Sequence, residues 1–290
     1  MQKPSTLIIA AWLLLSIKVN ASEKLSAQSL SQENLVYLST DEGLVIFEMA
    51  PLIAPKHVAR FKALVAEGFY DGLDFYRVID GFAAQGGDQS EQKKSQHRQP
   101  LAAEFTREVI TESTFTMVQS PEFLAEQTGF IEGFPAGKSK TEHLEWLLHC
   151  PGAVGMARNN EADSATTDFY VVIGQAPRHL DRNMSVFAQV VYGLENLQSM
   201  IRGNPNVNSG VIDEGKPRSK IIWAKLGTQV DMTEQMLLSR NAADSEAFQK
   251  RLSDARTLKN EFYQYKGTGN IDVCYYRPRI TVASVDILTP

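Results

Sequence analysis

Short apolar segments separated by turns dominate residues 34–228, and this pattern is the strongest constraint on the fold. Residues 34–50 predict two strands joined by a turn at Asp41-Glu42-Gly43, and further strands are predicted by DFYRVI, FAAQGGD, GAVGMAR, DFYVVIG and MSVFAQVVYG. Only two helices are predicted, one from Pro55 to just before Gly68 and one within residues 193–201. Many strands with two helices favour a mainly β fold, a closed or nearly closed antiparallel barrel, because closure leaves no unpaired strand edge.

The N-terminus has the pattern of a secretory signal peptide over residues 1–21. Lys3 precedes an apolar run at residues 7–17, and small residues lead up to Ala21. The run is far shorter than the roughly 20 residues that span a bilayer, so we expect cleavage and no stable membrane span afterwards. Cleavage removes two lysines and changes the net charge from -5 to -7, which is unfavourable for nucleic-acid binding. We therefore expect an exported protein; the resemblance described below favours the periplasm, with secretion as the alternative.

Three other segments lie outside the apolar pattern. Residues 22–33 are predicted to be a linker, and residues 106–149 an ordered excursion from the domain, without clear periodicity. Residues 229–290 form a C-terminal extension of mixed α/β character. In it, Ser245 can cap an amphipathic helix and RITVASVDI alternates like a strand. The expected organisation is thus one main domain, residues 34–228, with an insertion and an appendage.

The chain contains two cysteines, Cys150 and Cys274. An oxidising compartment permits a disulfide between them, and two buried thiols are the alternative, which the sequence leaves open. No Cys/His cluster follows at ligand spacing, so no metal site is predicted. A Lys-containing phosphate loop and a GxGxxG motif are also missing from the sequence, so it offers no nucleotide site.

Four blocks of sequence occur in the order found in one family: GFYDGLDFYRVIDGFAAQGGD, GAVGMAR, SATTDFYVVIG and PRHLDRNMSVFAQVVYGLENLQ. From Leu35 to Leu226, with the interruption at residues 106–149, the chain resembles cyclophilin-type peptidyl-prolyl cis-trans isomerases, including bacterial exported members. The resemblance implies an eight-stranded antiparallel β-barrel closed by two helices, with the proline-binding groove on its outside. It implies no cofactor, and proline-containing polypeptides as substrates.

The resemblance also assigns roles to individual residues. Arg77 is implied as the donor to the prolyl nitrogen, Gln85 as the amide that orients it, and Phe82 as the floor of the proline pocket. The substrate-binding positions are Ala83, Ala157, Arg158, Tyr170, His179, Leu180 and Met184. Several of these depart from the family pattern: Ala83 replaces a common methionine, Arg158 an asparagine, Tyr170 a phenylalanine and Met184 a histidine.

Two functions of different classes are compatible with these residues. The first is an isomerase that accelerates the folding of exported proteins, where proline isomerisation is a common slow step. The second is a catalytically weak module that binds proline-containing segments of a partner, because equal affinity for ground and transition states gives binding without rate. A hydrolase is not favoured, because no Ser/His/Asp order is present. The sequence specifies neither the client nor the oligomeric state.

Overall fold

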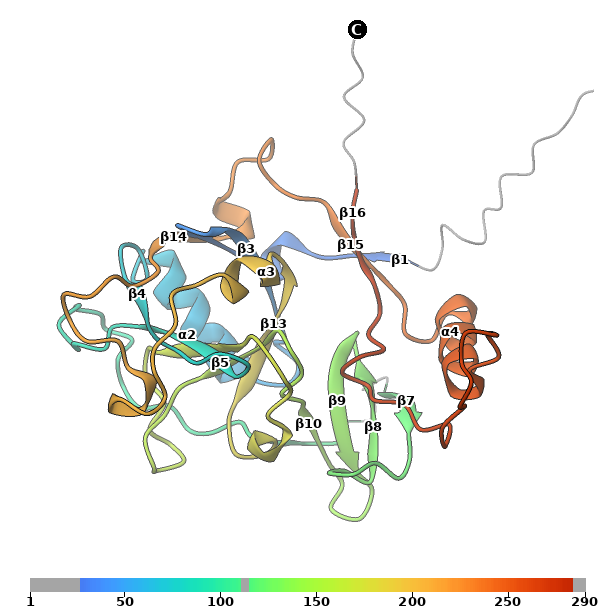
Figure 1. The fold of residues 1–290 in the computed structure, drawn as a ribbon. Coiled ribbons are helices and arrows are strands. Elements are labelled where there is room, and N and C mark those ends of the chain that lie inside the picture. The colour runs from blue at the N-terminus through green and yellow to red at the C-terminus, as the bar shows by residue number, and fades with distance from the viewer. Residues whose placement is uncertain (1–26, 111–114, 284–290) are drawn as a thin grey trace, which may run out of the picture.

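A computed structural model of the chain describes residues 27–110 and 115–283. Its main body is an eight-stranded antiparallel sheet with the strand order β14-β2-β3-β13-β11-β12-β5-β4 (Figure 1). The bounds are β2 Leu35–Thr40, β3 Gly43–Met49, β4 Asp74–Val78, β5 Ala83–Gly87, β11 Ala153–Met156, β12 Phe169–Val172, β13 Val186–Tyr192 and β14 Ile221–Leu226. The two outer strands meet, since the Phe75 amide donates to the Ser219 carbonyl at 2.9 Å. The sheet is therefore a nearly closed barrel, and the predicted fold class is confirmed.

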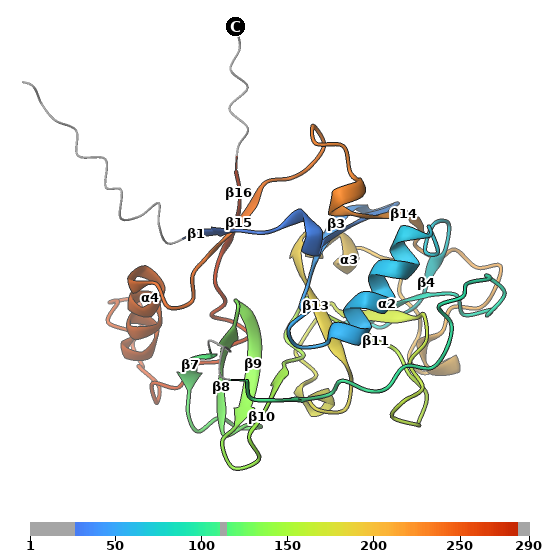
Figure 2. The same cartoon turned by 180° about the vertical axis from the view of Figure 1, so that it is seen from behind.

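Two helices cover the barrel: α2, Pro55–Ala66, and the short α3, Leu194–Gln198 (Figure 2). Helix α2 begins at Pro55 as predicted, and its side chains Val58, Phe61 and Leu64 are buried in the barrel core. Its first turn is capped from a distance, because the Glu104 carboxylate accepts hydrogen bonds from the amides of residues 56 and 57. This anion at the helix N-terminus is favourable for the helix dipole. Short 3-10 turns complete the barrel region: η1 Gln32–Asn34, η2 Arg178–Leu180, η3 Asn208–Gly210 and η4 Gly227–Gln229.

The excursion at residues 106–149 forms a separate antiparallel sheet, which we call the insertion sheet. Its strand order is β6-β10-β9-β8-β7, with β6 Arg107–Glu108, β7 Phe115–Gln119, β8 Gln127–Ile131, β9 Phe134–Ser139 and β10 Leu144–Leu147. The sequence did not predict these strands. All five residues of β8 are buried, and β9 is buried at five of six positions, so neither strand shows the alternation that marks a half-exposed strand.

The C-terminal extension packs against the insertion sheet. Strands β1 Ala27–Ser29, β15 Leu238–Asn241 and β16 Ile280–Val282 form a small sheet, and helix α4, Glu246–Thr257, follows β15. Ser245 caps α4 by accepting from the Phe248 amide, as its sequence predicts. Phe248 and Leu252 pack with Trp146 and Phe130 of the insertion sheet in one apolar cluster. A disulfide between Cys150 and Cys274, with Cα atoms 5.0 Å apart, joins the same two regions.

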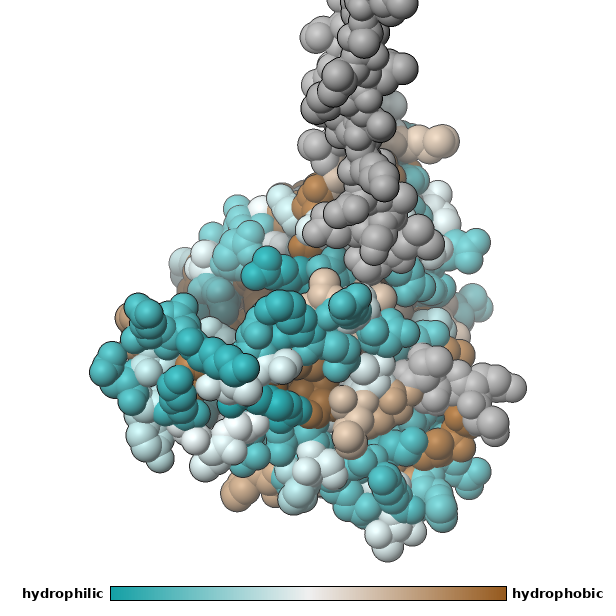
Figure 3. Space-filling view, turned by 90° about the vertical axis from the view of Figure 1, so that its right-hand side faces the viewer, coloured by the Kyte–Doolittle hydropathy of each residue, from teal (hydrophilic) through white to brown (hydrophobic). Residues whose placement is uncertain are grey.

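The side of the molecule that carries the insertion sheet and α4 is mainly hydrophilic. Figure 3 shows polar residues over most of this side, with apolar residues in small separate groups. Within the described ranges, no helix is both long and apolar enough to cross a membrane. The predicted signal peptide at residues 1–21 lies outside the described residues, as do residues 22–26 of the predicted linker. The rest of that linker is ordered structure, because it includes β1 and the first two residues of η1.

Candidate active site

One pocket on the outside of the barrel gathers nine of the ten predicted site residues. Its lining is Arg77, Phe82, Ala83, Gln85, Ala157, Arg158, Tyr170, Val172, Pro177, Leu180 and Met184. Of these, Val172 and Pro177 were not predicted. The tenth predicted residue, His179, is exposed on η2 and does not line the pocket. The lining comes from β4, β5 and β12, from the turn after β11, and from residues 177–184, which we call the wall loop.

Arg77 lies at the pocket because of the hairpin formed by β4 and β5. Its Cα is paired with that of Gln85 across the hairpin, and the register shifts between Asp74 and Arg77. Such an irregularity in a strand redirects the side chains beside it. The Arg77 Nε donates to the Ser209 carbonyl at 2.8 Å, and one Nη donates to Gln85 Oε1 at 3.5 Å. The half-buried guanidinium is therefore held from two sides.

Gln85 is itself oriented by a chain of buried groups. Its Nε2 donates to the Tyr76 hydroxyl at 2.6 Å, and that hydroxyl donates to Asp168 Oδ2 at 2.7 Å. Burial, followed by the Asp168 charge, raises the pKa of Tyr76 well above its ordinary value, so the phenol keeps its proton. Because the amide nitrogen is committed to Tyr76, the Gln85 carbonyl oxygen faces Arg77. The amide thus orients the arginine through a fixed chain.

The apolar part of the pocket lies between these polar groups and the wall loop. Phe82, Ala157 and Met184 are partly buried and pack with the buried Ala83 and Tyr170 in one cluster. Leu180, also partly buried, comes from the wall loop. A small side chain at position 83 and a thioether at position 184 leave a pocket whose wall can adapt, since methionine fills irregular spaces.

Arg158 is a second cation at the pocket. Its Nε and one Nη donate to the Asn183 carbonyl of the wall loop at 3.0 and 2.9 Å. The guanidinium lies over the Phe105 ring, 5.3 Å from the centroid. Over the described ranges of the chain, neither Arg77 nor Arg158 has a carboxylate partner within ion-pair distance. The pocket therefore presents two uncompensated positive charges on a chain of net negative charge.

Tyr170 carries a hydroxyl group, unlike the apolar side chains around it in the pocket wall, and this hydroxyl points away from the pocket. Its hydroxyl lies 2.8 Å from His149 Nε2, behind the pocket. The hydroxyl fits because Gly155 is its cross-strand neighbour, and a Cβ there would meet the phenol ring and hydroxyl inside van der Waals contact. Sequence reasoning did not identify Gly155 or His149 as supporting residues, because each becomes relevant only through this contact.

The site contains no evident place for a metal ion. In residues 27–110 and 115–283, no group of three or more His, Cys, Asp and Glu side chains could hold one. The pocket lining itself supplies hydrogen bonds and positive charge from guanidinium groups, next to an apolar surface. That combination binds and polarises a neutral substrate, and it includes no nucleophile or general base in contact with Arg77.

A β-barrel with an arginine, an amide and an apolar surface in one external pocket is what the resemblance to prolyl isomerases led us to expect. The model of the family "Cyclophilin type peptidyl-prolyl cis-trans isomerase/CLD" matches residues 35–222. The chain belongs to this family, and it is an enzyme of the peptidyl-prolyl cis-trans isomerase type. The resemblance expected from the sequence is thereby confirmed at the level of the family.

Curated relatives agree with this assignment. A probable peptidyl-prolyl cis-trans isomerase of Brucella suis biovar 1 (strain 1330) is 31% identical over 226 residues, covering 77% of this chain and 95% of the relative. Peptidyl-prolyl cis-trans isomerase B of Bacillus subtilis (strain 168) is also 31% identical, covering 58% and 90% respectively.

A solved structure extends the likeness beyond the barrel. The crystal structure of the cyclophilin AquaCyp293 from Hirschia baltica superposes with a TM-score of 0.73 at 26% identity, and the match covers 88% of this chain and 93% of that one. Residues 35–222, which the family model matches, make up a smaller share of this chain than that. The similarity in fold therefore includes residues outside the family-model match.

Proposed function

We propose that this isomerase acts on Xaa-Pro bonds of exported proteins, with Arg77 donating to the prolyl nitrogen in the twisted transition state. The observation that carries the proposal is the position of Arg77, held by the Ser209 carbonyl and by Gln85 at the edge of an apolar pocket. The family assignment supports the reaction, and the signal-peptide pattern of residues 1–21 supports export.

The reaction requires only differential binding. An X-Pro bond rotates slowly because amide resonance is lost on the way, at a barrier of about 18–20 kcal/mol. When the bond is twisted, the nitrogen lone pair is no longer delocalised and accepts a hydrogen bond. A guanidinium that donates to this nitrogen stabilises the twisted state more than either planar state, which lowers the barrier.

Each part of the pocket has a place in this scheme. The apolar residues Phe82, Leu180 and Met184 receive the proline ring, and Arg77 lies beside them as an always-charged donor. Gln85 prevents Arg77 from turning away, since its amide nitrogen is already bonded to Tyr76. A role restricted to binding is less favoured, because a mere recognition groove gives no reason to retain this oriented donor.

The proposal is tested by NMR exchange spectroscopy on short Xaa-Pro peptides with purified protein. We expect cis-trans exchange to accelerate with the wild type and the rate at saturating peptide to fall about 100-fold in Arg77→Ala, the usual loss for one transition-state donor. Peptide affinity should change much less, because the donor acts mainly in the twisted state. Arg202→Ala, at a partly buried arginine outside the pocket that pairs with the exposed Asp80, is the matched control. Binding with unaccelerated wild-type exchange would show that the pocket serves recognition alone.

Export is tested separately by following the full-length chain in its own cells. We expect a mature protein that lacks residues 1–21 to be found outside the cytoplasm, with Ser22 as its N-terminus. Retention of Met1 in a cytoplasmic protein would contradict this part of the proposal while leaving the isomerase assignment in place.

A further inference from the structure

The pocket is supported from behind by the insertion sheet. One apolar cluster contains the pocket residues Ala83, Tyr170 and Val172 together with insertion residues Ile131, Phe134, Ala136 and Leu147. The back of the proline pocket and one face of the insertion sheet are thus the same packed layer. Since packed layers transmit displacements instead of absorbing them, the insertion is placed to influence the pocket.

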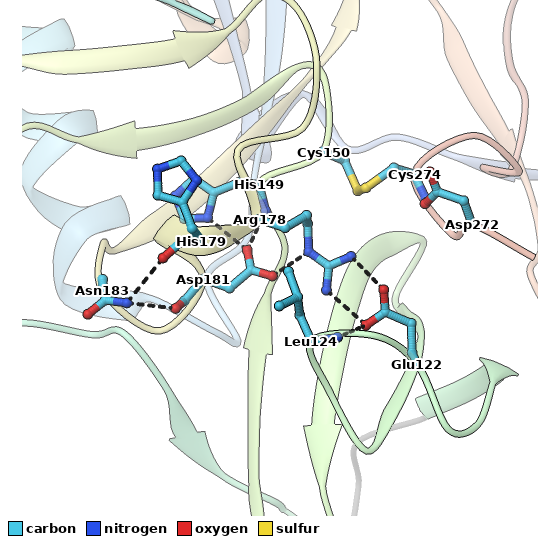
Figure 4. A network of polar contacts seen from close by, with 10 residues as sticks. All are labelled: Glu122, Leu124, His149, Cys150, Arg178, His179, Asp181, Asn183, Asp272 and Cys274. Carbon is cyan, nitrogen blue, oxygen red and sulfur yellow. Dashed lines mark hydrogen bonds and ion pairs between the residues drawn. A yellow bond between two sulfur atoms is a disulfide. The ribbon is translucent and has the colours of Figure 1, made fainter.

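A polar chain also runs from the insertion to the wall loop. The Glu122 carboxylate, in the turn between β7 and β8, accepts hydrogen bonds from both Nη groups of Arg178 at 3.3 Å (Figure 4). The Nε of Arg178 donates to Asp181. Arg178 is largely buried, and although burial lowers its pKa, the charges and hydrogen bonds of Asp181 and Glu122 outweigh this effect and raise it. Contacts of such low exposure are screened less by water and salt than surface ion pairs are.

His149 continues the chain to the pocket itself. The ring is fully buried, with Nδ1 2.9 Å from Asp181 Oδ1 and Nε2 2.8 Å from the Tyr170 hydroxyl. Burial, followed by the Asp181 charge, raises the pKa of Tyr170, so its hydroxyl keeps the proton. The hydroxyl lies within hydrogen-bond distance of Nε2, and Asp181 also accepts from the His149 backbone amide at 2.9 Å. Both ring nitrogens are therefore used, and the imidazole fixes the wall loop against Tyr170.

The wall loop is the segment that these contacts constrain. It contributes Pro177, Leu180 and Met184 to the pocket, and it contains Arg178 and Asp181 of the polar chain. We propose that Glu122, Arg178 and His149 are positioning residues: through them the insertion holds the wall loop in the arrangement that binds the proline-containing segment. This inference rests on the proposed function of the same pocket.

Loosening the wall loop should change the peptide dissociation constant but not the exchange rate at saturating peptide. If the wall loop is held less firmly, the binding-competent arrangement is less populated, and the apparent dissociation constant rises in inverse proportion. Arg77 and Gln85 are not members of the chain, since their contacts are with Ser209 and Tyr76. The exchange rate at saturating peptide should therefore remain while affinity falls.

The experiment compares two insertion carboxylates that both reach the wall loop. Glu122→Gln weakens the largely buried pair with Arg178, whose side chains are 17% and 10% exposed. Glu142→Gln removes the pair with Arg182, at 47% and 37% exposed, and is the matched control. For each protein, the dissociation constant of a short Ala-Pro peptide is measured by NMR titration, and the exchange rate at saturation by exchange spectroscopy.

We expect the dissociation constant to rise about three- to tenfold in Glu122→Gln and less than about twofold in Glu142→Gln, with saturated exchange rates unchanged in both. The 15N shifts of the His149 ring should also change in Glu122→Gln alone. Equal affinities for the two variants, or a loss of saturated rate without a loss of affinity, would overturn the inference. Because binding is measured directly, a wild type that binds but does not isomerise would refute the proposed function and still leave the affinity comparison decisive.

Discussion

The two sides of the pocket are built from very different parts of the chain. The donor side, with Arg77 and Gln85, is one hairpin, and its bonded side chains are eight residues apart. The opposite side, the wall loop, depends on Glu122 and on His149, which come from the insertion. With Arg77 as the proposed donor, transition-state stabilisation depends on this hairpin and on the barrel residues Ser209 and Asp168 that support it, whereas affinity for the substrate depends also on the insertion. A change in one part of the chain should affect one property more than the other.

Among the changes that should separate the two sides of the pocket, removal of the disulfide is expected to have the largest effect. The disulfide closes a loop with a sequence separation of 124, and Cys150 directly follows His149. For Cys150→Ala combined with Cys274→Ala, we expect the free energy of unfolding to fall by about 5 kcal/mol, as loop-closure entropy implies. Peptide affinity should fall as well, because the chain segment that carries His149 loses its anchor. Urea unfolding and peptide titration measure the two effects.

Wild-type protein treated with a thiol reductant is the control, and it should behave like the double variant. The saturated exchange rate should stay within about twofold, because distant, independent sites contribute additively and β4 and β5 contain neither cysteine. A rate that collapses together with affinity in folded protein would show that the two sides of the pocket are not separable.

The same contrast explains which features could be predicted from the sequence. Arg77, Phe82 and Gln85 lie within one short block, so the resemblance located them together, and the structure brings them to one pocket. The barrel strands were recognisable because apolar runs end at turns. The wall-loop contacts were not predictable, since the Glu122 to Arg178 pair spans 56 residues: Arg178 stands in a recognisable block, but Glu122 stands in none.

The strands of the insertion sheet could not be predicted from the sequence either. Strand β8 is buried on both faces between the neighbouring strands, the barrel and α4, so its sequence QTGFI shows no alternation. Gly137 in β9 allows Trp146 of β10 to lie directly over the backbone, where a Cβ would collide with the indole. The residues that bury both faces of β8 are distant from it in sequence. The sequence of β8 alone therefore does not indicate that it is a strand.

An intermediate effect is expected at the contact between Gly155 and Tyr170. In Gly155→Ala, the new Cβ meets the phenol, and we expect a loss of about 1–3 kcal/mol in unfolding free energy, the usual cost of overpacking. Tyr170 should be pushed toward the pocket, so peptide affinity should fall while Arg77 remains in place. Thermal unfolding and peptide titration measure these changes.

The matched variant is Gly155→Ala combined with Tyr170→Phe, which removes the hydroxyl but keeps the ring. We expect only partial recovery, because the Cβ would still approach the ring carbon that carried the hydroxyl, at 2.5 Å, and because the contact of the hydroxyl with His149 is lost. Full stability and affinity in the single Gly155→Ala variant would show that the wall opposite Arg77 adapts freely, and would weaken the distinction between the two sides.

The smallest expected effect is on the pH dependence of the unfolding free energy, through two carboxyl groups near the donor side. Burial raises the pKa of Asp88, but the Arg98 guanidinium and other donors outweigh it and bring the pKa below its ordinary 3.8. Burial raises the pKa of Asp168 above the same value, despite the hydrogen bond from Tyr76. Asp88 therefore contributes stability that is present above 3.8 and lost as the pH falls through its folded-state pKa. Asp168 acts oppositely: its contribution is present below 3.8 and lost as the pH rises through its folded-state pKa.

Two isosteric variants, Asp88→Asn and Asp168→Asn, separate the opposite contributions of these carboxyl groups to the pH dependence of stability. Between about pH 5 and pH 3, unfolding free energy should fall less steeply in Asp88→Asn than in the wild type, and more steeply in Asp168→Asn. Urea unfolding at a series of pH values measures the slopes, and Asp254→Asn, at an exposed surface pair with Lys250, is the control. Parallel slopes for the two variants would mean that the donor-side carboxylates titrate as one coupled group. Tyr76 and Gln85 would then be oriented by the pair, not by Asp168 alone.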